Sequence, residues 1–229
     1  MINKDISSQY SKYYNGKKLS KLYPTEFVVR SFLGSYENLK PNPQTSFLGK
    51  KVLDLGCGDG RNIPFLNDLG YEVYGLEINK EIVEFCFNNI KFNNYEAILK
   101  IGDNSNTGFL DRFFDCIVAC HSFYYLKNND SFHTNLDEIS RILKKGGRFV
   151  FSIPNHESYL LRDADFLGGG YAIVRSDPLN IRNGLKIKFF ENEYQIIESM
   201  NNKFDSFKIA LCENNWWGCK EFYWTVVCS

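Results

Sequence analysis

Short apolar runs alternate with segments of helical spacing in the middle of the chain. The apolar runs have the length of strands and occupy residues 52–55, 72–77, 95–101, 115–120 and 148–154. Between them, apolar residues recur every three or four positions, as in amphipathic helices, in residues 62–69, 81–92 and 136–143. Strands that alternate with helices indicate a parallel sheet with helices on both faces. The pattern therefore predicts an α/β fold built around residues 51–153.

The segments before and after this core follow other patterns. Before it, Pro24 and the spacing of Phe27 and Phe32 predict a helix over about residues 24–34, which we expect at the edge of the sheet. After it, residues 155–190 lack the pattern of core strands and helices, but 171–174 and 185–190 are expected to pair as a hairpin across Asn183 and Gly184. A helix is then expected at 193–200, followed by strands at 207–212 and 222–228. We expect a single domain over 1–229, in four parts: an N-terminal segment (1–50), the core (51–153), an insertion (154–192) and a C-terminal helix with two strands (193–229).

Three glycines mark the junction between the first strand and the first core helix. Gly56, Gly58 and Gly60 follow Asp54 at alternating positions. Glycine permits the backbone angles of a sharp turn and lets a ligand approach the main chain, and the free amides at a helix start favour a polar or anionic group. Dinucleotide-binding proteins also place glycines here, but with a different spacing. A nicotinamide-dependent oxidoreductase therefore stays as an alternative.

The run from Asp54 to Gly60 resembles the first motif of the class I S-adenosylmethionine-dependent methyltransferases. The resemblance implies that the glycine loop, with Cys57 and Asn62, passes beneath the amino-acid part of S-adenosylmethionine and that Asp54 helps to fix it. The product would be S-adenosylhomocysteine. It also implies a three-layer, Rossmann-like sheet of seven strands, mostly parallel with an antiparallel last strand, and an N-terminal helical lid.

Polar residues at the ends of the second and third strands complete the expected cofactor site. Glu77 ends the second strand about 20 residues past the glycines, where an acid accepts hydrogen bonds from a ribose diol. A solvated acid at the end of a strand is the alternative. By resemblance, Ile78 packs against the adenine and Asp103 receives its amino group. Gly102 and Asn104 flank Asp103 and are expected in the same wall.

Other candidates lie before the glycine loop and after the fourth strand. By resemblance, the N-terminal segment closes over the cofactor, with Tyr14 in contact and Arg30 on the cofactor carboxylate; an arginine on the solvated face of a helix is the alternative. Cys120 ends the fourth strand and His121 follows it, and both should border the methyl group. The insertion after the fifth strand would cover the site and select the substrate.

The chain has only three histidines, so candidates for a general base are few. His121 stands nearest the expected methyl group and His156 follows the fifth strand, whereas His133 is expected on the surface. A positioned base accelerates reactions that must remove a proton by about 10²- to 10⁴-fold. For His121, the alternative is to orient a tyrosine or the cofactor. The Asn/Asp-Pro-Pro-Tyr/Phe motif of methyltransferases that act on DNA or glutamine amides is absent, which argues against those substrates.

The composition of the chain limits the kinds of binding partner that we expect. Lysine plus arginine equals aspartate plus glutamate at 27 each, so the basic surface of a nucleic-acid-binding protein is not expected. No apolar run is long enough to span a bilayer, and the polar start is not a secretory signal, so we expect a cytoplasmic protein with no membrane partner. The seven cysteines form no Cys-x-x-Cys pair, which indicates reduced thiols and no metal site. A monomer or homodimer is expected.

The sequence thus favours a methyltransferase that acts on an oxygen or nitrogen atom of a small polar metabolite, with a sugar or the precursor of a bacterial surface polysaccharide as candidate acceptors. A non-catalytic protein that binds S-adenosylmethionine and serves regulation is the main alternative.

Overall fold

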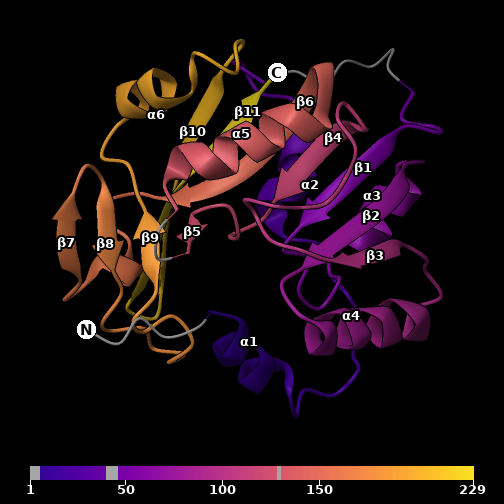
Figure 1. Ribbon diagram of the computed structural model, residues 1–229, viewed down its shortest axis with the longest axis horizontal. Coiled ribbons are helices and arrows are strands. Elements are labelled where there is room, and N and C mark those ends of the chain that lie inside the picture. Colours follow the sequence, from indigo (N-terminus) through magenta and orange to yellow (C-terminus); the bar gives the residue numbers. More distant parts are fainter. Residues whose placement is uncertain (1–5, 40–45, 128–129) are drawn as a thin grey trace.

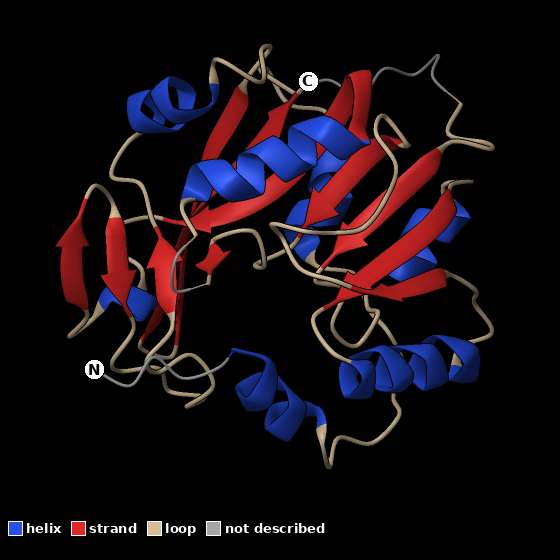
Figure 2. Cartoon of the chain, in the orientation of Figure 1, coloured by secondary structure: helices blue, strands red, loops and turns tan. Residues whose placement is uncertain are grey.

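The structure is a computed structural model that describes residues 6–39, 46–127 and 130–229. Its helices are α1 (Ile6–Tyr14), α2 (Glu26–Leu33), α3 (Ile63–Asp68), α4 (Lys80–Phe92), α5 (Phe132–Ile142) and α6 (Glu193–Met200), with a short 3-10 helix η1 (Tyr159–Leu161). Its strands are β1 (Lys51–Leu55), β2 (Glu72–Glu77), β3 (Ile98–Ile101), β4 (Phe114–Ala119), β5 (Tyr125–Leu126), β6 (Leu143–Pro154), β7 (Asp165–Gly168), β8 (Tyr171–Ile173), β9 (Lys186–Lys188), β10 (Lys208–Trp216) and β11 (Cys219–Cys228). Figures 1 and 2 show their arrangement.

The main sheet has seven strands in the order β10-β11-β6-β4-β1-β2-β3. β6, β4, β1, β2 and β3 run parallel to one another, and β11 is antiparallel to both of its neighbours, β6 and β10. The predicted Rossmann-like sheet with an antiparallel last strand is therefore confirmed. The strand order reverses beside β1, so the carboxyl ends of β1 and β4 border the crevice where open α/β sheets bind ligands.

Helices cover both faces of the main sheet. Side chains alternate along a strand, so Leu53 of β1 joins one core cluster, with residues of α5 and α6, while Val52 joins the other, with residues of α2, α3 and α4. Figure 1 shows α5 in front of the sheet, with α2 and α3 behind it. The two clusters make the three-layer core that sequence alternation predicted.

The helix predicted over residues 24–34 is α2, but its expected position at the edge of the sheet was wrong. Its buried residues, Phe27, Val28, Ser31 and Phe32, lie on one face of the helix. The three apolar ones among them pack with Val118 and Val150 of the central strands. The helix therefore lies on a face of the sheet, because only a face offers enough apolar surface for two phenylalanine side chains.

The insertion builds a second sheet of four strands in the order β5-β9-β8-β7. The expected pairing of residues 171–174 with 185–190 appears as β8 and β9, which are antiparallel. The segment that joins them is longer than a tight turn at Asn183 and Gly184, because the paired residues end at Ile173 and begin again at Lys186. The glycines 168–170 instead form the connection of the β7–β8 hairpin. In the described residues, no helix has the length and apolar character needed to cross a bilayer.

Candidate functional site

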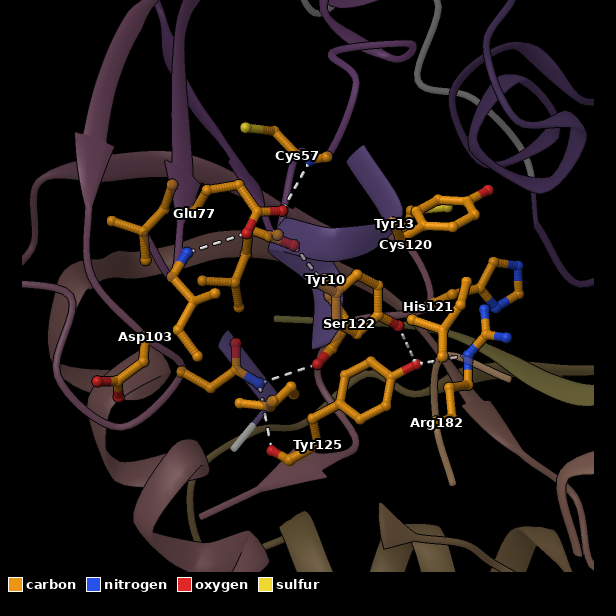
Figure 3. Close-up of a pocket in the computed structure, with 18 of the residues that line it drawn as sticks. Tyr10, Tyr13, Cys57, Glu77, Asp103, Cys120, His121, Ser122, Tyr125 and Arg182 are labelled. Carbon is orange, nitrogen blue, oxygen red and sulfur yellow. Dashed lines mark hydrogen bonds between the residues drawn. The ribbon is translucent and has the colours of Figure 1, made fainter. Parts of the chain in front are cut away.

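A cavity of about 450 Å³ lies at the carboxyl ends of β1, β2, β3 and β4. Figure 3 shows its walls, with α1 and the β8–β9 loop contributing side chains opposite the strand ends. Most of the residues that the sequence singled out line it: Tyr14, Gly56, Cys57, Gly58, Asn62, Glu77, Ile78, Gly102, Asp103, Asn104, Cys120 and His121.

Glu77 connects the end of β2 to the glycine loop. One carboxylate oxygen accepts the backbone N–H of Gly58 at 2.8 Å, and the other accepts that of Ile78 at 2.9 Å. Burial raises the pKa of Glu77, and these two backbone hydrogen bonds oppose the shift. Each carboxylate oxygen keeps lone-pair capacity beyond its single bond, so the group can accept further donors from the cavity.

The glycine loop has room only for glycine at two positions. Gly56 and Gly58 both have positive φ, 70° and 57°. A Cβ atom on Gly56 would lie 2.5 Å from Cβ of Ser122, and one on Gly58 would lie 2.5 Å from the hydroxyl oxygen of Tyr14. The missing side chains thus leave the backbone open to the cavity and let α1 close against the loop.

Asp54 lies at the end of β1, beneath the loop, and does not itself line the cavity. Its side chain is fully buried, and neither carboxylate oxygen has a hydrogen-bond partner in the described part of the chain. Burial, reinforced by the charges of Glu77 and Asp59, raises its pKa to about 7. An unpartnered buried carboxylate is costly, so its presence beside a cavity points to a ligand rather than to stability.

The loop after β3 is organised by Asp103. One of its oxygens accepts hydrogen bonds from the backbone N–H groups of Ser105 and Asn106, and the other pairs with Lys127 at 2.5 Å. Burial raises the pKa of Asp103, but the bonds from Lys127 and Ser105 outweigh it and leave the pKa below its usual value. Asn104 donates its amide to the carbonyl of Ser122 at 2.9 Å, which ties this loop to the one after β4.

His121 is the second residue after β4, which ends at Ala119. Its backbone has φ of 53°, and its N–H donates to the Ser152 hydroxyl oxygen at 2.9 Å. The same oxygen lies 3.0 Å from Nδ1 of the ring. The oxygen accepts the backbone N–H and carries a hydrogen that it can donate to Nδ1, which favours the tautomer with the ring proton on Nε2. Burial, and then the charges of Arg182 and Arg61, lower the pKa of His121 to about 4, so the ring is neutral at pH 7.

Three further residues of the wall lie outside the predicted cofactor motifs. The hydroxyls of Tyr10 and Tyr125 are 2.7 Å apart, and Nε of Arg182 donates to the Tyr125 hydroxyl at 2.8 Å. They come from α1, from β5 and from the loop between β8 and β9. None of the three belongs to a sequence motif. Only the folded insertion brings them together.

Two predicted residues lie away from the cavity. Arg30 is on the outer face of α2, where its guanidinium pairs with Glu26 at 2.7 Å and donates to the Tyr36 hydroxyl at 2.5 Å. His156 follows β6 with its side chain 46% exposed, 3.8 Å from Glu157. Neither lines the cavity, so the structure does not support the expected carboxylate contact of Arg30 or the expected role of His156 as a base. The apolar residues of α2 bury its other face and turn Arg30 to solvent.

Comparisons with known proteins agree with this geometry. A sequence family described as "Methyltransferase domain" matches residues 53–151. The putative methyltransferase YqeM of Bacillus subtilis is 26% identical over 113 residues, which cover 49% of this chain and 45% of that protein. The fatty-acid O-methyltransferase of Mycolicibacterium smegmatis is 30% identical over 111 residues, or 48% of this chain and 39% of that protein. The match therefore spans less than half the length of these two relatives.

Solved structures share the fold over more of the chain. A SAM-dependent methyltransferase from Methanosarcina mazei has a TM-score of 0.67 at 18% identity, covering 90% of this chain and 98% of that one. The 1,6-didemethyltoxoflavin-N1-methyltransferase of Burkholderia thailandensis, solved with S-adenosylhomocysteine, has a TM-score of 0.57 at 15% identity, covering 79% and 71%. The match over residues 53–151 and the shared fold are those of the class I S-adenosylmethionine-dependent methyltransferases.

The cavity fits the cofactor of this methyltransferase family. The open backbone at Gly56 and Gly58 leaves space for its amino-acid part, and the buried carboxylate of Asp54 lies without a partner beneath it. Glu77 offers free acceptor capacity at the end of β2, where a ribose would lie. Asp103 stands at the end of β3 in the wall expected for adenine.

Proposed function

We propose that this chain is an S-adenosylmethionine-dependent methyltransferase that acts on an oxygen or nitrogen atom of a small polar molecule. The observation that carries the proposal is the bond from the Gly58 N–H to Glu77, which joins the glycine loop and the ribose-binding acid in the wall of one cavity. When bound, S-adenosylmethionine supplies a methyl group on a sulfonium sulfur; the sulfur keeps the electron pair of the broken bond, and a lone pair of the acceptor forms the new bond.

The chain itself contributes binding and alignment. Glu77 would hold the ribose, the loop from Gly56 to Gly58 the amino-acid part, and Asp103 the adenine. Tyr14 closes the cavity from α1, with its hydroxyl over Gly58. Holding donor and acceptor in line can lower a barrier by roughly 7 to 11 kcal/mol, so positioning alone accounts for much of the catalysis.

His121 borders the expected methyl position, and we propose that it orients the acceptor as a neutral hydrogen-bonding group. A pKa of about 4 makes the imidazole a weak proton acceptor at pH 7, and the bond to Ser152 favours a proton on Nε2. The fatty-acid O-methyltransferase among the relatives is named for transfer to oxygen, which supports an oxygen acceptor. The residues of the cavity give no particular support to a sugar.

Calorimetric titration tests the proposal directly. S-adenosylhomocysteine should bind to the purified protein, and NAD⁺ should not, whereas tight binding of NAD⁺ would favour the oxidoreductase. Turnover is tested by release of S-adenosylhomocysteine from S-adenosylmethionine in the presence of a metabolite extract. Binding without release from any fraction of the extract would instead support the regulatory protein, and absence of binding would refute the family's activity for this chain.

A further inference from the structure

The loop between β8 and β9 brings a buried arginine to the cavity. Arg182 lies in this loop, its side chain is only 15% exposed, and it lines the same cavity as the glycine loop. An arginine remains charged in a protein, so its guanidinium is a fixed cation in the wall.

The loop is built to hold Arg182 in place. The carboxylate of Asp177 is fully buried and accepts the backbone N–H groups of Leu179, Ile181 and Arg182 at 2.9 to 3.1 Å. The N–H of Asp177 in turn donates to the side chain of Asn183 at 2.8 Å. These bonds fix the backbone on both sides of residue 182, so the position of its side chain does not depend on a bound ligand.

Only part of the guanidinium is satisfied. Nε donates to Tyr125 at 2.8 Å, and Nη1 lies 3.3 Å from both oxygens of Asp177 and 3.4 Å from the Tyr159 hydroxyl. Nη2 has no hydrogen-bond partner within the described ranges 6–39, 46–127 and 130–229. Asp177 does not line the cavity, so the group that faces the interior is the cation and not its counter-ion.

In the described part of the chain, Arg182 forms an ion pair with Asp177 alone; Glu221 of β11 lines the same cavity but forms no ion pair with it. The Tyr125 hydroxyl accepts the hydrogen bond of Nε, and the hydroxyls of Tyr10 and Tyr124 lie 2.7 and 3.3 Å from that of Tyr125. Burial raises the pKa of Tyr10 and Tyr124, so these phenols stay neutral. They can donate or accept hydrogen bonds but cannot neutralise Arg182.

The free side of Arg182 faces the expected reaction site. In Figure 3 its guanidinium points toward the ring of His121, with Tyr125 and Tyr10 beside it. His121 follows the end of β4, where the transferred methyl is expected. A group bound to Nη2 would therefore be part of the acceptor and not of the cofactor, whose expected contacts lie at Glu77 and the glycine loop.

We infer that Arg182 binds a carboxylate of the methyl acceptor, so that the substrate is a small organic acid. The inference rests on the proposed methyltransferase function and adds the substrate class and a specificity-determining residue. The free Nη2 can donate to one oxygen of a carboxylate, and a phenolic hydroxyl beside it can donate to the other. The tyrosines and the apolar Leu179 and Ile181 in the same wall would contact the body of the molecule.

Binding of matched probes tests the inference. Protein saturated with S-adenosylhomocysteine is titrated with benzoate and with benzamide, which share a ring and differ in charge. We expect benzoate to bind at least about tenfold more tightly, because hydrogen bonds to charged groups are the stronger ones. Arg182→Met should abolish this preference and Arg182→Lys should retain part of it. Arg175→Met, which removes an exposed arginine paired with Asp165, is the matched control and should keep it.

A second measurement identifies the natural acceptor's charge. A metabolite extract is separated on an anion exchanger, and each fraction is assayed for release of S-adenosylhomocysteine. Activity should reside in the retained fraction, and conversion of carboxylates to amides with carbodiimide and ammonia should destroy it. Loss of activity after phosphatase treatment would identify a phosphate instead and overturn the inference, as would activity in the unretained fraction.

The two proposals fail in different ways. Equal binding of benzoate and benzamide, or equal losses in Arg182→Met and Arg175→Met, would overturn the role of Arg182 while cofactor binding remains intact. Absence of S-adenosylhomocysteine binding in the parent protein would refute the methyltransferase function itself. Binding of S-adenosylhomocysteine by Arg182→Met as tight as in the parent also shows that the variant is folded.

Discussion

The carboxylate of Glu77 accepts the backbone N–H of Gly58 at 2.8 Å, across 19 positions of the chain. This bond joins the end of β2 to the glycine loop after β1, so the acid expected to bind the ribose also sets the shape of the loop. The two functions share one side chain, because neighbouring parallel strands end at the same edge of the sheet.

Glu77→Gln should weaken binding of S-adenosylhomocysteine by about 10- to 100-fold, since hydrogen bonds to a charged acceptor contribute about 1.5 to 3 kcal/mol. The amide can still accept from Gly58, so the fold should persist. Isothermal titration calorimetry measures the loss. Glu81→Gln changes an exposed glutamate in the first turn of α4 and should bind like the parent. Equal affinities of the two variants would contradict the role of Glu77.

Gly58→Ala should impair cofactor binding through a clash with α1. The new Cβ would lie 2.5 Å from the Tyr14 hydroxyl, and the positive φ of 57° adds strain of about 1 to 2 kcal/mol. Gly49→Ala is a matched control, because Gly49 has φ of 73° and nothing within 4 Å of the new atom. It should lose similar stability and no cofactor affinity.

A double-mutant comparison separates clash from strain. In a Tyr14→Phe background the hydroxyl oxygen is gone, so Gly58→Ala should cost less cofactor affinity there than in the parent. Thermal unfolding and calorimetry of the four proteins give both quantities. If the loss of affinity is the same in both backgrounds, Tyr14 does not cover Gly58 in solution.

The sequence predicted elements whose signals are local. β2 (Glu72–Glu77) and α6 (Glu193–Met200) coincide with the expected ranges, because alternation and helical spacing mark them directly. Helix α5 begins at Phe132, earlier than expected, because Ser131 and Thr134 form a capping box that the apolar spacing does not reveal. β6 starts at Leu143, beside Phe114 of β4, and not at residue 148 as expected, so Lys144 and the glycines after it belong to the strand.

Elements that depend on distant partners were missed. β5 is only two residues long and exists because Tyr125 and Leu126 pair with β9, 60 residues further on. α1 has no buried residue, so the sequence shows no apolar stripe that would predict this helix. Hydrogen bonds from the Asn79 side chain to the hydroxyls of Ser7 and Ser11 hold it in place. In the same way, the residues expected to bind the cofactor could be predicted because they lie at the ends of strands. The position of Arg182 could not, because it depends on how the insertion folds.

The stability of the protein should reflect the neutral state of His121. Its pKa in the folded protein, about 4, lies below the value near 6.5 of an unfolded chain, because burial and the charges of Arg182 and Arg61 disfavour the proton. Its contribution is therefore present at neutral pH and is lost as pH falls from 6.5 toward 4. Between pH 7.5 and pH 5 this loss should amount to about 2 kcal/mol.

Urea unfolding at the two pH values measures that loss. His121→Asn should show a smaller decrease in the free energy of unfolding than the parent, by about 2 kcal/mol, and asparagine tolerates the φ of 53° at this position. The comparison with the parent cancels the titration of other groups. His133→Asn alters an exposed histidine of α5 and should leave the decrease unchanged. A parent-like decrease in His121→Asn would mean that its ring titrates normally.

Asp54→Asn should separate cofactor binding from stability. Burial, with Glu77 and Asp59 adding to it, raises the pKa of the carboxyl to about 7, so the stability of the ligand-free protein should fall as pH rises through 7. Between pH 6 and pH 8 this group should account for about 1 kcal/mol of that fall, and Asp54→Asn should lack it. The variant should also bind S-adenosylhomocysteine about tenfold less tightly, since a charge beneath the loop is removed. Urea unfolding at both pH values measures the change in the free energy of unfolding between pH 6 and pH 8, with Asp68→Asn as the exposed control. If Asp54→Asn leaves this change as it is in the parent, the carboxylate has a hydrogen-bond partner in solution.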